Sequence, residues 1–419
     1  MPSFTAVSLR PGLLALPWVL PVEDWPDDIV VALPRGISRH VVRFVRTDGR
    51  VLAVKEMAPH VALREHQLLR ELRRLDLPVV SSIGVVTDRI AADGEALDAL
   101  LLTDHLAYSL PYRAVFAGSP RPDTVQRLVD ALAVLLVRLH LDGFSWGDCS
   151  LSNTLFRRDA DGFAAYLVDA ETGDLRHHLS EGQRAYDLEL ATTNIFGELL
   201  DLQAAGVLAE DADLHAVTDR LDQRYRALWN ELVAPEEFTD TDTQRISSRV
   251  RRLNDLGFDV AEIDIVTDIG GDTVRIQPRV VDAGFHRQRL LHLTGLDVEE
   301  NQARRLLNDI AEYAVATDQQ GLGDDMLAHE WLTRVFEPVV QGIPPDLRAK
   351  LDPAQLYHEI LEHRWYTAEQ AGREVGIDET LSSYTDRVLR HRPDELVALD
   401  PDTVELAAIS RDDADSTDD

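Results

Sequence analysis

The first hundred residues contain short runs in which apolar and polar positions alternate, a pattern typical of half-buried strands. Runs of this kind cover residues 29–33, 41–45, 51–54, 79–86 and 97–103. Between the third and fourth runs, leucines at positions 68, 69, 72 and 75 have helical spacing and predict a helix over residues 61–75. The order predicts a small antiparallel sheet accompanied by one helix.

Beyond residue 122 the apolar positions recur at helical spacing. Helices are predicted over residues 125–140, 186–205 and 211–232, with a loop at 142–153 and a hairpin at 154–168 between the first two. Strands followed by helices are typical of an α+β fold. This part of the chain therefore predicts a sheet lobe joined to a larger helical lobe.

A run rich in Pro, Glu, Thr and Asp at residues 235–243 predicts a domain boundary. The elements expected after it are a helix carrying Arg245, Arg249, Arg251 and Arg252, a hairpin of residues 260–267 and 273–281, and helices to about residue 399. They predict a second α+β, mostly helical domain. The acidic end of the chain predicts a disordered tail.

The net charge of the chain limits the classes of molecule that it is expected to bind. The 419 residues include 42 Lys and Arg against 74 Asp and Glu, a formal net charge of −32, with 45% hydrophobic residues. This composition indicates a globular protein with an acidic surface, which opposes nucleic-acid binding because that needs a basic footprint. The apolar stretch at residues 11–22 is too short to span a bilayer, so no membrane insertion is expected.

Cysteine and lysine are both scarce. The lone Cys149 excludes an intramolecular disulfide and favours a reducing, cytoplasmic location. The only lysines are Lys55 and Lys350, a bias that either GC-rich coding or life in high salt explains. Lys55 ends a predicted strand, and Glu65 lies on the helix that follows. Lys55 is therefore either a surface residue or an ammonium that Glu65 holds toward the phosphates of a nucleotide.

The predicted loop at 142–153 carries two polar side chains five positions apart. Asp148 and Asn153 stand between a helix ending in Leu-His and an apolar strand, so the loop presents a carboxylate to a hydroxyl and an amide to a metal ion. Asp169 ends the next strand, and pairing of the two strands brings it beside Asn153. Hard oxygen ligands of this kind suit magnesium.

These residues resemble the protein-kinase-like superfamily, most closely its lipopolysaccharide (Kdo-type) kinases, aminoglycoside phosphotransferases and RIO-type kinases. The chain as a whole resembles actinobacterial proteins that join a kinase-like half to a C-terminal domain of unknown function. The resemblance implies a two-lobed protein-kinase-like fold. The expected organisation is an N-terminal extension (1–28), a small lobe (29–107), a helical lobe (108–235), a C-terminal domain (236–400) and a tail (401–419).

The resemblance implies ATP and Mg2+ as cofactors and gives each residue a role. It implies Lys55 as the phosphate-binding lysine with Glu65 as its partner, and Asp148 as the catalytic base. It implies Asn153 and Asp169 as magnesium ligands. The stretch expected to meet adenine is Thr103, Asp104, His105 and Leu106.

The chain departs from the kinase pattern at three points. Where a glycine-rich loop is expected, only Gly36 is a glycine, and Ser38 or Arg39 would replace the missing backbone contacts. Trp146 stands in place of the usual histidine before Asp148. After Asp169, Ala170-Glu171 replaces Phe-Gly.

Two smaller features of the sequence each allow a structural and a functional interpretation. Asp187 either braces the loop around Asp148 or is a solvated acid near the start of a helix. Cys149 is expected to be a small packed residue and not a nucleophile.

The sequence favours an ATP- and magnesium-dependent phosphotransferase that acts on a hydroxyl of an unidentified sugar, small molecule or protein. The alternative is a weak or inactive nucleotide-binding scaffold whose C-terminal domain recruits a protein partner. The retained Lys55, Asp148, Asn153 and Asp169 favour the enzyme, whereas the poor glycine loop favours the scaffold.

Overall fold

A computed structural model describes most of the chain as two compact units. The described residues are 2–6, 11–31, 40–117, 122–233, 236–238, 258–267, 274–392 and 394–395. Unit 1 comprises residues 1–156, 165–222 and 397–419, and unit 2 comprises residues 157–164 and 223–396. The domain boundary expected at residue 235 stays a prediction.

Several features expected from the sequence lie outside the described residues. They are the loop residues Gly36, Ser38 and Arg39, the helix with Arg245, Arg249, Arg251 and Arg252, and the tail at 401–419.

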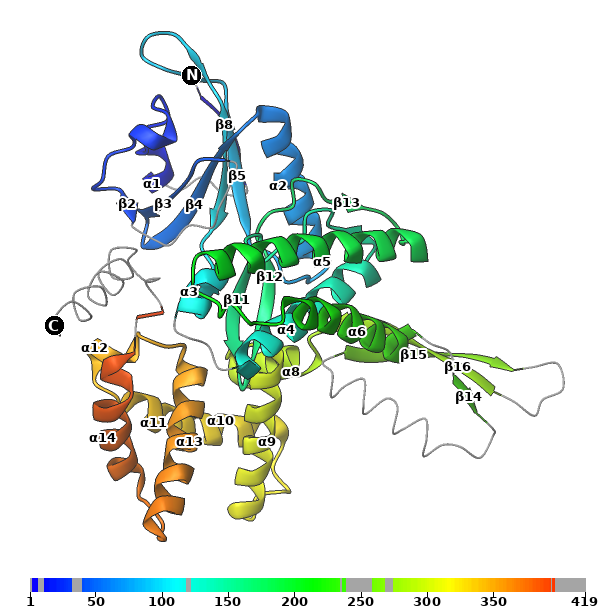
Figure 1. Ribbon diagram of the computed structural model, residues 1–419. Helices are drawn as coiled ribbons and strands as arrows, with labels where there is room; N and C mark the ends of the chain where they lie inside the picture. Colours follow the sequence, from blue (N-terminus) through cyan, green and yellow to red (C-terminus); the bar gives the residue numbers. More distant parts are fainter. Residues whose placement is uncertain are drawn as a thin grey trace, which may run out of the picture. The chain divides into compact units, whose positions relative to one another are not determined.

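Unit 1 contains a six-stranded antiparallel sheet (Figure 1). In spatial order its strands are β1 Ser3–Ala6, β5 Ser82–Thr87, β8 Ala99–Asp104, β4 Arg50–Met57, β3 Val42–Thr47 and β2 Val30–Val31. The β1 strand pairs with β5 at one edge, so part of the segment interpreted as an extension belongs to the sheet. Four residues were too few to reveal an alternating pattern.

Helix α2 (Pro59–Arg74) follows β4 and packs near β5 and β8. It begins at a proline, which suits the first helical position because no hydrogen bond is required of its nitrogen. The face predicted from the leucine spacing is buried, with Leu69 and Leu72 both at 0% exposure. Glu65 is also fully buried on this helix, which makes a charge partner necessary.

The rest of unit 1 is mainly helical. Its helices are α3 Tyr112–Ala117, α4 Pro122–Leu141 and α5 Glu181–Ala204, together with the first part of α6 (Leu214–Val233), whose residues from 223 on belong to unit 2. A three-stranded sheet has the order β12-β11-β9, with bounds β12 Gly162–Leu167, β11 Thr154–Asp159 and β9 Ser109–Pro111. Short pairs are formed by β10 (Phe144–Ser145) with β13 (Asp174–Leu175), and by β6 (Arg89–Ile90) with β7 (Ala96–Leu97). The kinase-like α+β fold expected from the sequence is present.

Unit 2 combines an antiparallel sheet with a helical bundle, as expected for a mostly helical α+β domain. The sheet has the order β14-β16-β15, with bounds β14 Glu236–Phe238, β16 Val274–Ala283 and β15 Phe258–Thr267. The helices are α8 Phe285–Thr294, α9 Glu300–Ala316, α10 Asp324–Trp331, α11 Glu337–Gln341, α12 Pro345–Arg348, α13 Pro353–Ala371 and α14 Ile377–Arg387. A π-helical turn, η2 (Leu332–Phe336), connects α10 and α11.

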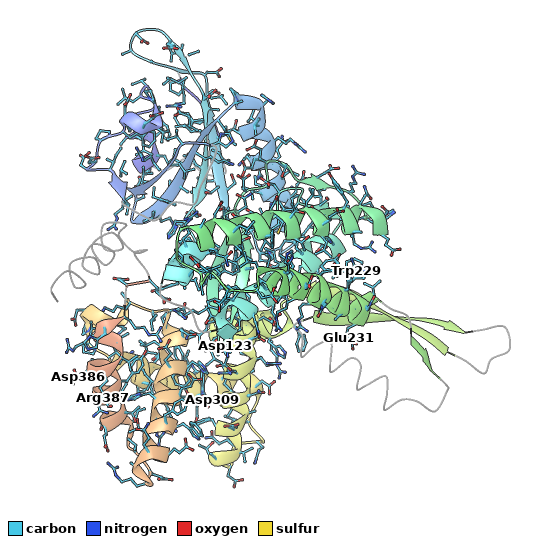
Figure 2. The ribbon with its side chains drawn as sticks, in the orientation of Figure 1. Asp123, Trp229, Glu231, Asp309, Asp386 and Arg387 are labelled. Carbon is cyan, nitrogen blue, oxygen red and sulfur yellow. The ribbon has the colours of Figure 1, made fainter. Side chains whose placement is uncertain are left out.

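The bundle of unit 2 packs around aromatic side chains. Trp331, Phe336 and Tyr357 contact one another and lie in one hydrophobic core. Asp309 on α9 (Figure 2) accepts hydrogen bonds from Trp331 Nε1 at 2.8 Å and from the Tyr357 hydroxyl at 2.5 Å. Without these bonds, the polar atoms of Trp331 and Tyr357 would be buried in the core without a hydrogen-bond partner.

The turn between β11 and β12 belongs to unit 2, where Asp159 is buried. Its carboxylate accepts hydrogen bonds from the backbone nitrogens of Asn301 and Gln302, at 3.2 and 2.7 Å, in the first turn of α9. Burial and the nearby charge of Glu299 nevertheless raise the pKa of Asp159 to about 7. The helix therefore holds this carboxyl in a site that disfavours its charge.

None of the helices in the described ranges is both long enough and apolar enough to cross a bilayer.

The segment before β2 is attached to the sheet by a buried arginine. Arg89 has no exposed side-chain surface, and it donates to Glu56 Oε1 at 2.6 Å and to the Trp18 carbonyl at 3.0 Å. Its guanidinium also donates to the Leu20 carbonyl, and Glu56 in turn accepts from the Val22 nitrogen at 3.2 Å. Trp18 is itself 6% exposed in the core of the sheet.

We expect Arg89→Ala to lower the free energy of unfolding by about 3–5 kcal/mol, because it leaves Glu56 and three backbone carbonyls without their buried partner. Urea denaturation measures this change. Arg127→Ala is the control, because its exposed ion pair with Asp123 should contribute less than about 1 kcal/mol. Equal losses in the two variants would contradict the role assigned to Arg89.

Candidate active site

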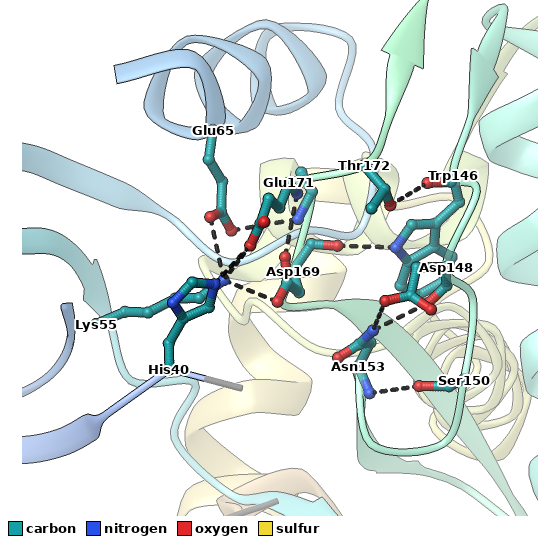
Figure 3. A network of polar contacts seen from close by, with 11 residues as sticks. His40, Lys55, Glu65, Trp146, Asp148, Ser150, Asn153, Asp169, Glu171 and Thr172 are labelled. Carbon is teal, nitrogen blue, oxygen red and sulfur yellow. Dashed lines mark hydrogen bonds and ion pairs between the residues drawn. The ribbon is translucent and has the colours of Figure 1, made fainter. Parts of the chain in front are cut away.

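Lys55 lies in the centre of the unit 1 sheet and points into a group of carboxylates (Figure 3). Its Nζ is 3.2 Å from Glu65 Oε2 and 2.8 Å from Asp169 Oδ2, and it lies 3.6 Å from Glu171 Oε2. The side chain is only 12% exposed. The surface interpretation of Lys55 is therefore wrong, and the expected pair with Glu65 is present, while Glu71 is exposed on the same helix.

The carboxylates decide the protonation of Lys55. Burial alone would lower its pKa, but the charges of Glu65 and Asp169 outweigh burial and raise it. The pKa of Glu65 is raised to about 7 by burial and by the charge of Asp169, with Lys55 and the Ala170 nitrogen acting in the opposite direction. Lys55 is therefore charged at neutral pH, whereas Glu65 is close to taking up a proton there.

Asp148 sits in a loop that two amide side chains hold. Asn153 Nδ2 donates to the Asp148 carbonyl at 2.9 Å and to its Oδ2 at 3.3 Å. Asn194 Nδ2, on α5, donates to Asp148 Oδ1 at 3.2 Å and to the Cys149 carbonyl at the same distance. Both carboxylate oxygens are therefore oriented by donors, and the side chain remains partly exposed.

Asp187 braces this loop from α5. It is 1% exposed and accepts hydrogen bonds from the backbone nitrogens of Trp146 and Gly147, each at 2.7 Å, and from His140 Nε2 at 2.9 Å. These donors outweigh burial and lower the pKa of Asp187, so it stays charged. Gly147 has φ of 76°, a left-handed conformation that favours glycine. The bracing interpretation of Asp187 is the correct one.

Trp146 connects the loop to the segment around Asp169. Its ring nitrogen donates to the Asp169 carbonyl at 2.8 Å, and its own carbonyl accepts from the Thr172 hydroxyl at 2.8 Å (Figure 3). The tryptophan that replaces the expected histidine therefore still links these two stretches of chain.

Glu198 supports the other end of the loop. Its carboxylate accepts from the backbone nitrogens of Leu151 and Ser152, at 2.6 and 3.0 Å. Cys149, between these stretches, is fully buried, and burial raises the pKa of its thiol. It is packed as expected, and a neutral buried thiol is a poor nucleophile.

The hairpin brings Asn153 beside Asp169, because the Val168 nitrogen donates to the Asn153 carbonyl at 3.1 Å. Asp169 Oδ1 accepts from the Glu171 nitrogen at 3.1 Å, and its Oδ2 faces Lys55. The amide nitrogen of Asn153 donates to Asp148, and its amide oxygen accepts no hydrogen bond from the described residues. Two oxygen-bearing side chains thus lie together at one end of a cavity.

The cavity has a volume of about 640 Å3, within the range of small-molecule sites. Apolar side chains line it, among them Ala53 and Leu101 from the six-stranded sheet and Leu155 from β11. The four residues expected to meet adenine, Thr103, Asp104, His105 and Leu106, also line it. Burial lowers the pKa of His105 to about 4, so its ring is neutral at physiological pH.

The sequence did not identify four polar side chains of this site. His40 Nε2 is 2.9 Å from Glu171 Oε2, and Glu171 lies near Lys55. Asn194 and Glu198 hold the loop from α5. A signal for the last two was present in their spacing from Asp187, which places them seven and eleven positions later on one helix face.

We expect the raised pKa of Glu65 to make unfolding pH-dependent. Because the folded protein binds this proton more tightly than the unfolded chain, the free energy of unfolding should fall as pH rises from about 4.5 to about 7. Glu65→Gln should remove this part of the slope, and Glu71→Gln, an exposed change on the same helix, should retain it. Urea titrations across this pH range test the difference, and identical slopes in the wild type and Glu65→Gln would contradict it.

The chain is similar to known proteins in two regions. Residues 50–194 match the lipopolysaccharide kinase (Kdo/WaaP) family, and residues 227–389 match a domain of unknown function, DUF4032. Among solved structures, the chain is similar to WaaP in complex with acyl carrier protein, with 19% identity and a TM-score of 0.34, over 55% of this chain and 90% of that one. A search of curated proteins found no match. The two family matches confirm the resemblance inferred from the motifs and support a kinase-like phosphotransferase.

Proposed function

We propose that the protein is an ATP- and magnesium-dependent phosphotransferase that transfers the γ-phosphoryl group to a hydroxyl. The observation that carries this proposal is the position of Lys55, whose buried ammonium faces a cavity also lined by Asn153 and Asp169. An ammonium group beside oxygen ligands is suited to bind a nucleoside triphosphate together with its cation.

The donor set fits magnesium. Asp169 supplies a carboxylate and Asn153 an amide oxygen, both hard ligands of the type that magnesium prefers. When bound, magnesium would neutralise charge on the β- and γ-phosphates. Lys55 would orient the same phosphates, and Glu65 keeps the lysine in place. The apolar walls of the cavity suit a flat base, and residues 103–106 are among those that line it.

The transfer step requires one proton acceptor. The acceptor's hydroxyl oxygen would form a bond to the γ-phosphorus while the bond between that phosphorus and ADP breaks. Asp148 would accept the hydroxyl proton. Its two oxygens are already oriented by Asn153 and Asn194, which supports a positioned base over a mobile surface acid.

We expect Asp148→Ala to retain nucleotide binding and to reduce transfer by about 10²- to 10⁴-fold, the usual contribution of a positioned base. Alanine is the better substitution, because an asparagine would turn an amide donor toward the donors of Asn153 and Asn194. Calorimetry with ATP and transfer of labelled phosphate give the two measurements. Asp174→Asn, an exposed change in the same unit, is the control.

Nucleotide binding by the wild type without transfer to any acceptor would contradict the enzyme. The nucleotide-binding scaffold would then account better for the retained Lys55 and Asp169.

We also expect magnesium and nucleotide to bind with mutual coupling. Magnesium alone should bind weakly, because it competes with Lys55 for Asp169 and lacks the phosphate oxygens that would complete its ligands beside Asn153. A non-hydrolysable ATP analogue should tighten its binding by about 5- to 150-fold. Calorimetric titration of magnesium with and without the analogue measures this coupling, and Asp169→Asn should weaken it. Equal magnesium affinity with and without the analogue would contradict the proposed magnesium site.

A further inference from the structure

We propose that unit 2 positions the two proposed magnesium ligands by holding the turn of the hairpin that carries them, and that Asp159 is the positioning residue. The hairpin consists of β11 and β12, with Asn153 directly before β11 and Asp169 two residues after β12. The inference rests on the proposed phosphotransferase function. It gives a role to the C-terminal domain, whose family match assigns none.

The chain passes from one unit to the other twice within this hairpin. Residues 154–156 and 165–167, at its open end, belong to unit 1, and residues 157–164, around its turn, belong to unit 2. The open end is attached within unit 1, because the Leu167 nitrogen donates to the Pro78 carbonyl at 2.9 Å. Among the described residues, the sheet contains one other strand, the three-residue β9. So small a sheet depends on further contacts for its order.

The residues before the turn are bound by ion pairs in unit 2. Arg157 Nη1 lies 2.9 Å from Glu299 Oε1. Arg158 donates to Glu395 Oε1 through two nitrogens, Nε at 2.9 Å and Nη2 at 2.7 Å. A guanidinium that donates twice to one carboxylate fixes direction as well as distance. The end of β11 is therefore held at two successive residues.

Asp159 makes the most specific contact of the turn. It is 3% exposed, and it accepts three hydrogen bonds in the first turn of α9. The Asn301 nitrogen and Nδ2 donate to Oδ2 at 3.2 and 2.8 Å, and the Gln302 nitrogen donates to Oδ1 at 2.7 Å. A carboxylate at the positive end of a helix is also favoured by the helix dipole. Both oxygens are occupied, so the turn has one position on α9.

The backbone of the turn is strained, which indicates that its surroundings fix it. Ala160 has φ of 54°, a left-handed conformation that is unfavourable for a residue with a Cβ. Such conformations persist where neighbouring contacts impose them. The residues on both sides of Ala160 contact α9, since Asp161 accepts a hydrogen bond from Arg305. Unit 2 thus imposes the shape of this turn.

The paired strands carry this constraint to the magnesium ligands. Residues 153–159 span about 20 Å as extended chain. At the open end the Val168 nitrogen donates to the Asn153 carbonyl at 3.1 Å, so the segments that carry Asn153 and Asp169 move together. Release of the turn would therefore loosen both ligands. The backbone of residues 146 and 147 would stay in place, because Asp187 on α5 holds it.

Magnesium affinity tests the role of Asp159 in the full chain. We expect Asp159→Ala to weaken magnesium binding in the presence of a non-hydrolysable ATP analogue by about 10- to 100-fold, the range for residues that orient metal ligands. Affinity for the analogue without magnesium should be unchanged, and calorimetry measures both. Asp309→Ala is the matched control, because it removes a carboxylate that accepts bonds from Trp331 and Tyr357 in unit 2 and leaves the turn intact. It should keep the wild-type magnesium affinity.

Hydrogen exchange tests the hairpin without any ligand. Asp159→Ala should speed exchange of the Val168 amide by about tenfold or more, and should leave the amides of Trp146 and Gly147 unchanged. A general loss of stability would speed all of them, in Asp309→Ala as well. Mass spectrometry of peptides from both segments gives the rates, and thermal unfolding checks that the variants fold. If Asp159→Ala does not fold, Asp159→Asn, which keeps one acceptor oxygen, should show smaller changes in the same direction.

The outcomes separate this inference from the function on which it rests. Wild-type magnesium affinity and wild-type Val168 exchange in the Asp159 variants would overturn the inference and leave the phosphotransferase standing. Equal effects of the Asp159 and Asp309 variants would also overturn it. Failure of the wild type to bind nucleotide would overturn the proposed function, and the exchange rates would still decide whether unit 2 holds the hairpin.

Discussion

The buried ammonium of Lys55 is the constraint on which the rest of unit 1 depends. A charge that is 12% exposed in the middle of a sheet must be paired, because an unpaired buried charge costs several kcal/mol. Its partners, Glu65 and Asp169, come from α2 and from the chain after β12, ten and 114 residues away. Satisfying one lysine therefore fixes a strand, a helix and a hairpin against each other.

Helix α5 holds the loop around Asp148 in a comparable way. Loop backbone nitrogens need partners when they are shielded from water. Asp187 and Glu198 together accept four of them, from residues 146, 147, 151 and 152, and Asn194 donates to the loop between these pairs. Together with Asn153, this helix face thus sets the position of Asp148.

Local sequence patterns predicted much of this arrangement, and long-range contacts account for what they missed. Helix α2 and the hairpin of β11 and β12 followed from spacing and turn residues, and they bring Lys55, Glu65, Asn153 and Asp169 together. Helix α5 begins at Glu181, five residues before the predicted start, because Ser180 and Gln183 form a capping box that the sequence already contained. The His40 contact with Glu171 spans 131 positions, and no local pattern announces such a pair.

Glu171 changes the charge balance of the proposed nucleotide site. With Glu65 and Asp169 it places three carboxylates within reach of one ammonium, and one oxygen of each lies within 4.8 Å of the other two. A triphosphate adds further negative charge to the same place, which Lys55 alone cannot offset. A divalent cation would supply the missing positive charge. The proposed site therefore favours binding of nucleotide together with magnesium over binding of free nucleotide. The replacement of Phe-Gly by Ala170-Glu171 strengthens this requirement, because Glu171 adds a carboxylate.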